Sequence, residues 1–140
     1  MLKGIDPLLS GDTLRLLDLM GHGDRVVVVD ANFPAFSQAR RVVHMGAGAE
    51  RAMEAILSVL PLDTGEDHPV QCMVADSEPA ALHKVHNLVL DAVRGREPRV
   101  TDLGLLPRSA FYVVAQTAFA AVVTQERAPY ANFVLTKGVL

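Results

Sequence analysis

Two residues in the segment MGHGDRVVVVDANFP have side chains that could move a proton on a small ligand. His22 lies between Gly21 and Gly23, and glycines let a ligand come close to the backbone. Imidazole is the side chain best matched to giving and taking a proton at neutral pH. Asp30 follows the apolar run 26–29 and supplies a carboxylate. We therefore interpret the stretch from His22 to Asp30 as part of a site that works by proton transfer.

Both residues also have a structural interpretation, which the sequence leaves open. A histidine where a helix ends is favoured by the helix dipole, and His22 follows an expected helix. An aspartate ahead of Asn32 and Pro34 is typical of a turn, which would account for Asp30 without any ligand.

Three further residues, Arg108, Tyr130 and Asn132, enlarge the candidate set. Alone, Arg108 is typical of a helix surface, and Tyr130 and Asn132 are typical of a turn that leads into a strand. With His22 and Asp30, they combine donors and acceptors for hydroxyl groups with an aromatic ring for the apolar face of a sugar. The set therefore favours a carbohydrate ligand.

We expect neither a metal nor a cofactor at this set. His83 and His86 are three residues apart on an expected helix, but no third ligand, HExxH pattern or cysteine pair accompanies them. We interpret them as solvated helix residues. Gly46 and Gly48 resemble the start of a dinucleotide loop, but Arg51 stands at the third glycine position.

Hydrophobic periodicity and capping residues predict the elements that would position these side chains. The predicted order is a helix over 10–20, strands over 25–30 and 41–45, a helix over 49–60, a strand over 70–75, a helix from its cap Ser77 to Gly95, a strand over 99–103, a helix over 107–116, and strands over 119–124 and 133–136. This alternation predicts one α/β domain over residues 1–140, a three-layer α/β/α fold with a mixed sheet of about six strands. We expect the last two strands to pair antiparallel across a turn at 128–131.

Ligands of open α/β sheets bind at the carboxyl ends of the strands. Asp30 directly follows a strand, whereas His22 lies in the loop that enters the same strand. The two residues are therefore expected at opposite ends of the sheet unless a neighbouring element or subunit brings them together.

Composition limits the partners. A net charge of -3 and scattered Lys and Arg residues provide no basic surface for nucleic acid. No apolar run of about 18 residues and no secretory layout is present, so we expect no membrane partner. A single cysteine, Cys72, in the run VQCMVA indicates a buried thiol and a cytoplasmic location. Half of the residues are hydrophobic, which favours a homo-oligomer that covers apolar surface.

Three blocks of the sequence are similar to the L-fucose mutarotase and D-ribose pyranase family. They are LKGIDPLLS near the start, MGHGDRVVVVDANFPA in the first third, and ERAPYANFVLTKGV near the end. Their order and their distances from both termini match the family. The chain resembles the fucose branch more closely in the run RSAFY at 108–112 and in QER at 125–127.

The resemblance implies an isomerase without a cofactor, a mutarotase that interconverts the α and β anomers of a reducing monosaccharide such as L-fucose. It implies that His22 is the acid/base and that Asp30 binds substrate and takes part in catalysis, with Arg108, Tyr130 and Asn132 as sugar contacts. It also implies a homo-oligomer, a decameric ring, in which Tyr130 and Asn132 reach a neighbour's site. Such sharing would bring His22 to the sugar.

Two alternative functions remain open at this point. One is the interconversion of pyranose and furanose forms, as in a D-ribose pyranase, and the other is sugar binding by an oligomer without catalysis. Ala131 stands where the family often has glycine, and we expect its methyl group to affect the sugar pocket.

Overall fold

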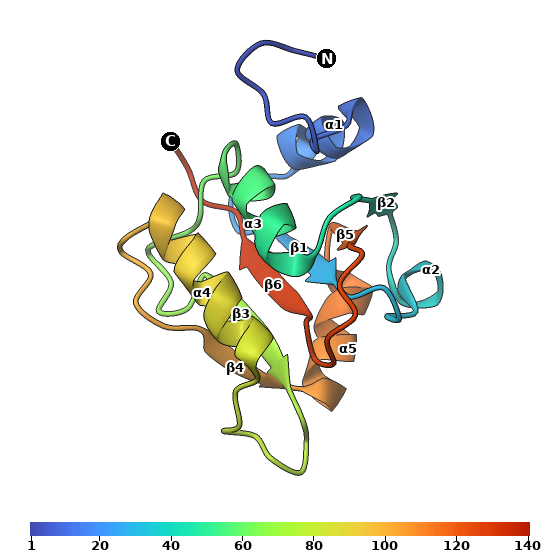
Figure 1. The fold of residues 1–140 in the computed structure, drawn as a ribbon, viewed down its shortest axis with the longest axis vertical. Helices are drawn as coiled ribbons and strands as arrows, with labels where there is room; N and C mark the ends of the chain where they lie inside the picture. The colour runs from blue at the N-terminus through green and yellow to red at the C-terminus, as the bar shows by residue number, and fades with distance from the viewer.

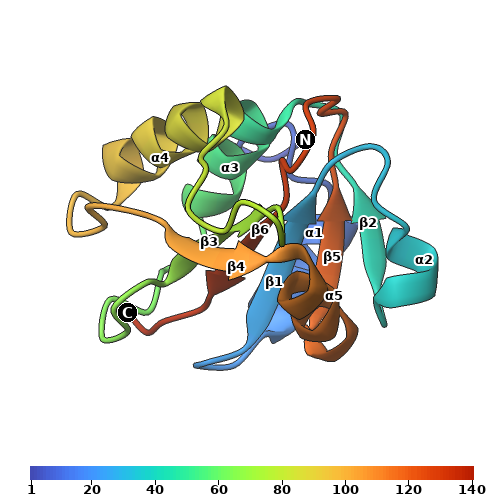
Figure 2. The same ribbon diagram turned by 90° about the horizontal axis from the view of Figure 1, so that it is seen from below.

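The computed structural model describes residues 1–140 as a six-stranded sheet with helices on both faces (Figure 1). The strands are β1 (Arg25–Val29), β2 (Val42–His44), β3 (Val70–Val74), β4 (Gly104–Pro107), β5 (Ala120–Val123) and β6 (Phe133–Thr136). The helices are α1 (Gly11–Leu19), α2 (Ala35–Gln38), α3 (Ala49–Leu57), α4 (Lys84–Arg96) and α5 (Arg108–Thr117). Figure 2 shows α3 and α4 on one face of the sheet and α5 on the other. The predicted three-layer α/β/α fold with a mixed sheet is confirmed.

The alternating side chains of β1 explain the two apolar layers. Val26 and Val28 lie in the larger core, with side chains of α1, α3 and α4. Val27 and Val29 lie in a smaller core, with side chains of α2 and α5. Successive residues of a strand point to opposite faces, so an uninterrupted valine run suits a strand that is covered on both faces.

The sheet order is β2-β5-β1-β6-β3-β4, which puts β1 between β5 and β6. The prediction that the last two strands pair with each other is therefore wrong. β6 runs antiparallel to both β1 and β3, and the other neighbouring strands are parallel. The connection at 124–132 is longer than a tight hairpin loop and carries the chain past the end of β1. This crossing gives the apolar β1 a partner on each edge.

The start of α4 also differs from the prediction, because the helix begins at Lys84 and not after Ser77. Turns occupy the intervening segment, where the backbone N–H of Ala81 donates to the carbonyl of Glu78. Helix starts leave backbone N–H groups without partners. At α4, the N–H of His83 donates to Nδ1 of His86 at 2.9 Å, so the His86 side chain supplies this partner.

The strand predicted over 99–103 lies further along, as β4 at Gly104–Pro107. Gly104 pairs with Gln71 of β3, and a Cβ added at Gly104 would lie 2.8 Å from Cβ of His68. Close pairing of β3 with β4 therefore requires glycine at this register position, which is a common reason for glycine in a strand.

The short helix α2 follows the predicted turn at 31–34 and was not foreseen as a separate element. Its Ala35 packs into the smaller core beside Phe33 and Phe111. None of the five helices has the length and apolar character that a membrane span requires.

Candidate functional site

A hollow of about 290 Å³ opens beside the carboxyl ends of β1 and β3 and the start of α5. Its volume is at the small end of the range for small-molecule sites. It contains four of the five predicted site residues. The lining residues are Asp30, Asn32, Phe33, Met73, Arg108, Tyr112, Arg127, Ala128, Pro129, Tyr130 and Asn132.

A larger hollow of about 670 Å³ lies between α1 and the C-terminal residues. Its lining is mostly aliphatic, and its amine, Nζ of Lys137, donates to the carbonyls of Leu17 and Met20. Polar groups that converge on open space are the mark of a specific ligand site. The smaller hollow has them, so it is the candidate site.

Asp30 and Asn132 form the buried polar centre of the site. The Asp30 backbone N–H donates to Oδ1 of Asn132 at 2.8 Å, and Nδ2 of Asn132 donates to Oδ2 of Asp30 at 2.9 Å. The second carboxylate oxygen, Oδ1, accepts from the backbone N–H of Asn32 at 2.8 Å. Asp30 is 8% exposed and Asn132 4%. The carboxylate is thus held in one orientation, with acceptor capacity left for a ligand hydroxyl.

The antiparallel pairing of β1 with β6 explains this contact. β1 ends at Val29 and β6 begins at Phe133, and Val28 pairs with Phe133. The residue after one strand therefore faces the residue before the other. No spacing in the sequence links Asp30 with Asn132, because they are 102 residues apart.

Tyr130 lies at the rim of the hollow in an unusual backbone conformation, with φ of 60°. Its carbonyl oxygen lies 2.8 Å from Nε2 of His86, and its ring stacks on the ring of His83 at a centroid distance of 5.0 Å. The next residue, Ala131, is fully buried in the larger core. Its methyl group therefore packs in the core and does not line the hollow.

His86 is fully buried, so its interpretation as a solvated helix residue is wrong. Burial, the largest cause, lowers the pKa of His86, and the neighbouring His83 acts in the same direction. His83 itself is half-buried, with its ring against Tyr130. The spacing of these histidines predicts that both lie on a helix, but no local pattern indicates that one of them contacts the site loop.

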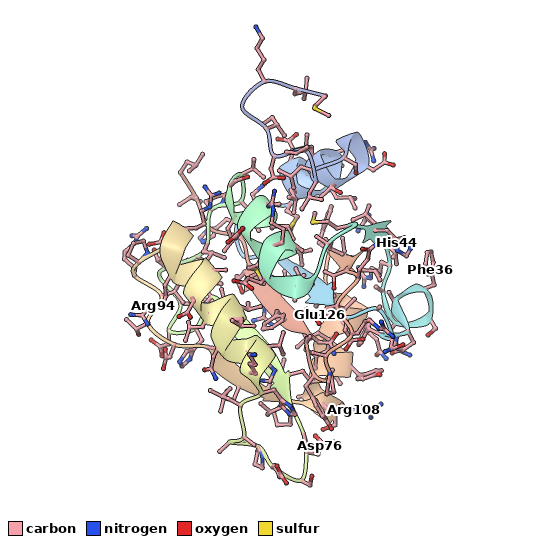
Figure 3. All side chains as sticks on the ribbon, viewed as in Figure 1. Phe36, His44, Asp76, Arg94, Arg108 and Glu126 are labelled. Carbon is pink, nitrogen blue, oxygen red and sulfur yellow. The ribbon has the colours of Figure 1, made fainter.

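Arg108 is the first residue of α5 and lies at the open side of the hollow. Its guanidinium carbon lies 4.7 Å from the centre of the Tyr112 ring, and Nη2 donates to the Tyr112 hydroxyl at 3.3 Å. Asp76 holds this end of the helix, since its Oδ1 accepts from the backbone N–H and the hydroxyl of Ser109. Figure 3 shows Asp76 and Arg108 at the same end of the molecule.

Glu126 holds the loop that carries Arg127 to Tyr130. Its Oε1 accepts from the backbone N–H groups of Arg127 and Ala128, and its Oε2 accepts from the N–H of Ala49 at the start of α3. These bonds, chiefly that from Ala128, lower the pKa of the carboxyl group. Sequence reasoning did not select Glu126, Asn32, Tyr112 or Arg127 as site residues.

His22 is the one predicted residue that does not lie at the hollow. It precedes β1, whereas Asp30 follows it, and a five-residue strand spans about 17 Å. The His22 side chain is 59% exposed, and its Nε2 lies 3.1 Å from Oδ2 of Asp63. Asp30, Tyr130 and Asn132 line one hollow of the same chain, whereas the resemblance implies that Tyr130 and Asn132 reach a neighbour's site.

No three His, Cys, Asp or Glu side chains come together in this structure in an arrangement that could hold a metal ion. The lone thiol, Cys72, is buried in the core, and burial raises its pKa to about 12. The groups at the hollow are therefore a carboxylate, amides, cations and phenol hydroxyls.

Comparison with known proteins gives matches over nearly the whole chain. Residues 3–140 match the RbsD / FucU transport protein family. The L-fucose mutarotase of Haemophilus influenzae (strain PittGG) is 37% identical over 140 residues, which cover 99% of this chain and 97% of that protein.

Two crystal structures of similar proteins have the same fold. FucU from Bifidobacterium longum superposes with a TM-score of 0.91 at 36% identity and 99% coverage of both chains. The fucose mutarotase of Streptococcus pneumoniae, solved in complex with L-fucose, superposes with a TM-score of 0.87 at 34% identity, also over 99% of both chains.

Proposed function

The chain belongs to the RbsD / FucU transport protein family, and from this membership and the geometry of the hollow we propose that it is an L-fucose mutarotase. It interconverts the α and β anomers of L-fucose or a closely related monosaccharide. The observation that carries the proposal is the buried Asp30 carboxylate, oriented by Asn132 and Asn32 at a hollow of monosaccharide size.

The reaction needs only proton transfers and control of the sugar's orientation. A base removes the proton of the anomeric hydroxyl while an acid protonates the ring oxygen, and the bond between the anomeric carbon and the ring oxygen breaks. The aldehyde rotates and the ring closes on either face with the reverse proton transfers. Acid/base catalysis of this kind contributes about 10²- to 10⁴-fold.

In this proposal, the side chains at the hollow orient the sugar. Asp30 accepts a hydrogen bond from a sugar hydroxyl and takes part in the proton transfer, while Asn132 keeps the carboxylate in place. Arg108 donates to hydroxyl groups at the open side, and Tyr130 and Tyr112 offer aromatic rings to the apolar face of the sugar. Orientation of the reacting groups adds to the rate beyond the acid/base contribution.

The histidine that transfers the proton is His22 of a neighbouring subunit. A strand length separates it from Asp30 within one chain, so it cannot reach a sugar in its own hollow. Its exposed ring is free to enter the hollow of another copy, with Asp63 accepting from it. The assembly that follows is a homo-oligomer with shared sites, for which we propose a decameric ring.

Two further parts of the proposal concern the protein as a whole. Residues 1–140 act as one domain, with all six strands in a single sheet. The enzyme works in the cytoplasm, where a lone buried thiol such as Cys72 needs no disulfide partner.

Exchange NMR on L-fucose tests the function directly. We expect the wild-type protein to increase the exchange of magnetisation between the α and β anomeric protons, and His22→Ala to abolish this increase. D-ribose serves as the comparison sugar. Faster pyranose/furanose exchange of D-ribose would favour the pyranase alternative, and binding of sugars without faster exchange would favour the non-catalytic oligomer. Full activity of His22→Ala would contradict only the role of His22.

A further inference from the structure

We propose that His86 is a positioning residue for the sugar site, which holds Tyr130 at the rim of the hollow through a hydrogen bond to the Tyr130 carbonyl. His86 lies on α4, outside the hollow, and is fully buried. Its Nε2 lies 2.8 Å from the Tyr130 carbonyl oxygen. The proposal rests on the proposed function, because its test measures the exchange of L-fucose anomers.

The hydrogen bonds of His86 define its tautomer. Nδ1 accepts from the backbone N–H of His83, so Nδ1 carries no proton. The Tyr130 carbonyl can only accept, so the proton lies on Nε2. The neutral Nε2–H form therefore ties the start of α4 to the site loop, and a doubly protonated ring would place an N–H against the N–H of His83.

Tyr130 needs such a restraint because of its backbone. A φ of 60° lies in the left-handed region, which is uncommon for a residue with a bulky side chain and persists where the surroundings hold it. The hydrogen bond from His86 fixes the Tyr130 carbonyl, and the stacked His83 ring fixes its side chain. Both histidines thus act on one residue that lines the hollow.

The surroundings of His86 favour the neutral ring. It faces His83, the residue before its own helix, with ring centroids 5.4 Å apart, and on the site loop it faces Tyr130. From β6 it meets the Phe133 ring, and from β3 the backbone of Met73. No carboxylate is among these contacts, and burial lowers the pKa of His86. Protonation at Nδ1 would keep the Nε2–H donor to Tyr130 but remove the acceptor for the His83 N–H, so the connection between the start of α4 and the site loop should hold at neutral pH and weaken in acid.

Two substitutions separate the two hydrogen bonds of His86. In His86→Asn, the side-chain amide lies where Nδ1 of His86 lies in the wild type. Its oxygen can accept from the His83 N–H, but the side chain is too short to reach the Tyr130 carbonyl. Gln in His86→Gln extends its NH₂ group to the position of Nε2 and can still donate to Tyr130. Gln at the third position of a helix is also compatible with the helix start.

The experiment measures KM and kcat for L-fucose anomer exchange in the full-length wild type and both variants. We expect His86→Asn to raise KM about tenfold, the loss expected for one hydrogen bond, with kcat within about twofold. His86→Gln should stay within about twofold of the wild type in both constants. Because burial lowers the pKa of His86 in the folded protein, the wild-type KM should rise only in solution more acid than the usual histidine pKa of about 6.5, and the KM of His86→Gln should lack that rise.

The proposal is overturned if His86→Asn has the wild-type KM, or if His86→Gln is as impaired as His86→Asn. If His86→Asn does not fold, the proposal is tested by the pH dependence of KM, which should differ between the wild type and His86→Gln. If the wild type itself neither binds nor exchanges L-fucose, the proposed function fails instead. In that case the Tyr130 amide resonance tests the hydrogen bond between His86 and the Tyr130 carbonyl. This resonance should shift in His86→Asn and keep its wild-type position in His86→Gln.

Discussion

Asn132 makes two hydrogen bonds to Asp30, accepting from its backbone N–H and donating to its carboxylate, although 102 residues separate them. Both residues are buried, and they join the end of β1 to the start of β6. The pair therefore stabilises the crossing of the chain past β1 and also orients the carboxylate proposed to bind sugar. A substitution at Asn132 should affect stability and ligand binding together.

Asn132→Asp is expected to lower the free energy of unfolding by about 2–4 kcal/mol and to abolish measurable L-fucose binding. The variant has the same shape, but it loses the donor to Asp30 and brings two buried carboxylates together. Urea unfolding and saturation-transfer NMR measure the two effects. Asn87→Asp adds the same charge on the exposed side of α4 and should change stability by less than about 0.5 kcal/mol. Equal stability of the two variants would contradict the structural role of the pair.

Mixed oligomers test whether His22 acts in a neighbour's site. His22→Ala and Asp30→Ala should each be inactive alone, because each removes a group that the proposed reaction needs. The two variants are then mixed in equal amounts, dissociated and reassembled. Half of the shared sites in the mixed oligomers contain Asp30, and half of these sites receive His22 from the neighbouring subunit, so about a quarter of the sites contain both wild-type groups. Exchange NMR on L-fucose should then recover about a quarter of the wild-type rate. Continued inactivity of verified mixed oligomers would argue against a shared site.

Gly104→Ala is expected to destabilise the pairing of β3 with β4. The added methyl group would lie 2.8 Å from Cβ of His68 and 2.9 Å from Cγ of Gln71, and crowding of this kind lowers stability by about 1–3 kcal/mol. Gly95→Ala is the matched control, because nothing lies within 4 Å of its added Cβ and α4 continues through it. That variant should gain about 0.5–1 kcal/mol from helix propensity. Urea unfolding distinguishes the two, and similar effects at both positions would contradict the proposed fit.

The stability of the protein should depend on pH through His86. The pKa of His86 is lowered in the folded state, mainly by burial, so the unfolded chain takes up a proton first as the pH falls. The contribution of neutral His86 is thus complete above the unfolded pKa of about 6.5 and is lost as the pH falls from there through the folded pKa. The slope from this single group is at most about 1.4 kcal/mol per pH unit.

Urea unfolding at several pH values, for the wild type and His86→Asn, measures this contribution. The difference in unfolding free energy between the two should shrink as the pH falls below about 6.5, since Asn does not titrate. A difference that stays constant over this range would mean that His86 does not change its protonation on unfolding.

Local patterns in the sequence were sufficient for most of the elements. The valine run of β1 predicts a strand covered on both faces, Ser10 predicts the start of α1, and Pro107 the start of α5. These features depend on residues close together in the chain, and the structure confirms them. The predicted start of α4 at Ser77 was wrong, because the His86 ring, and not the side chain of Ser77, accepts the hydrogen bond from a backbone N–H at the helix start.

The arrangement of the site depends on strand order, which local patterns do not encode. The sequence by itself selected Asp30, Arg108, Tyr130 and Asn132 by residue type and resemblance, and it also determined that His22 and Asp30 flank one strand. Only the tertiary structure decided that β6 pairs with β1, which brings Asn132 to Asp30. The physical reason is that an apolar strand gains two partners when the chain crosses it, and this gain comes from contacts between residues far apart in the chain.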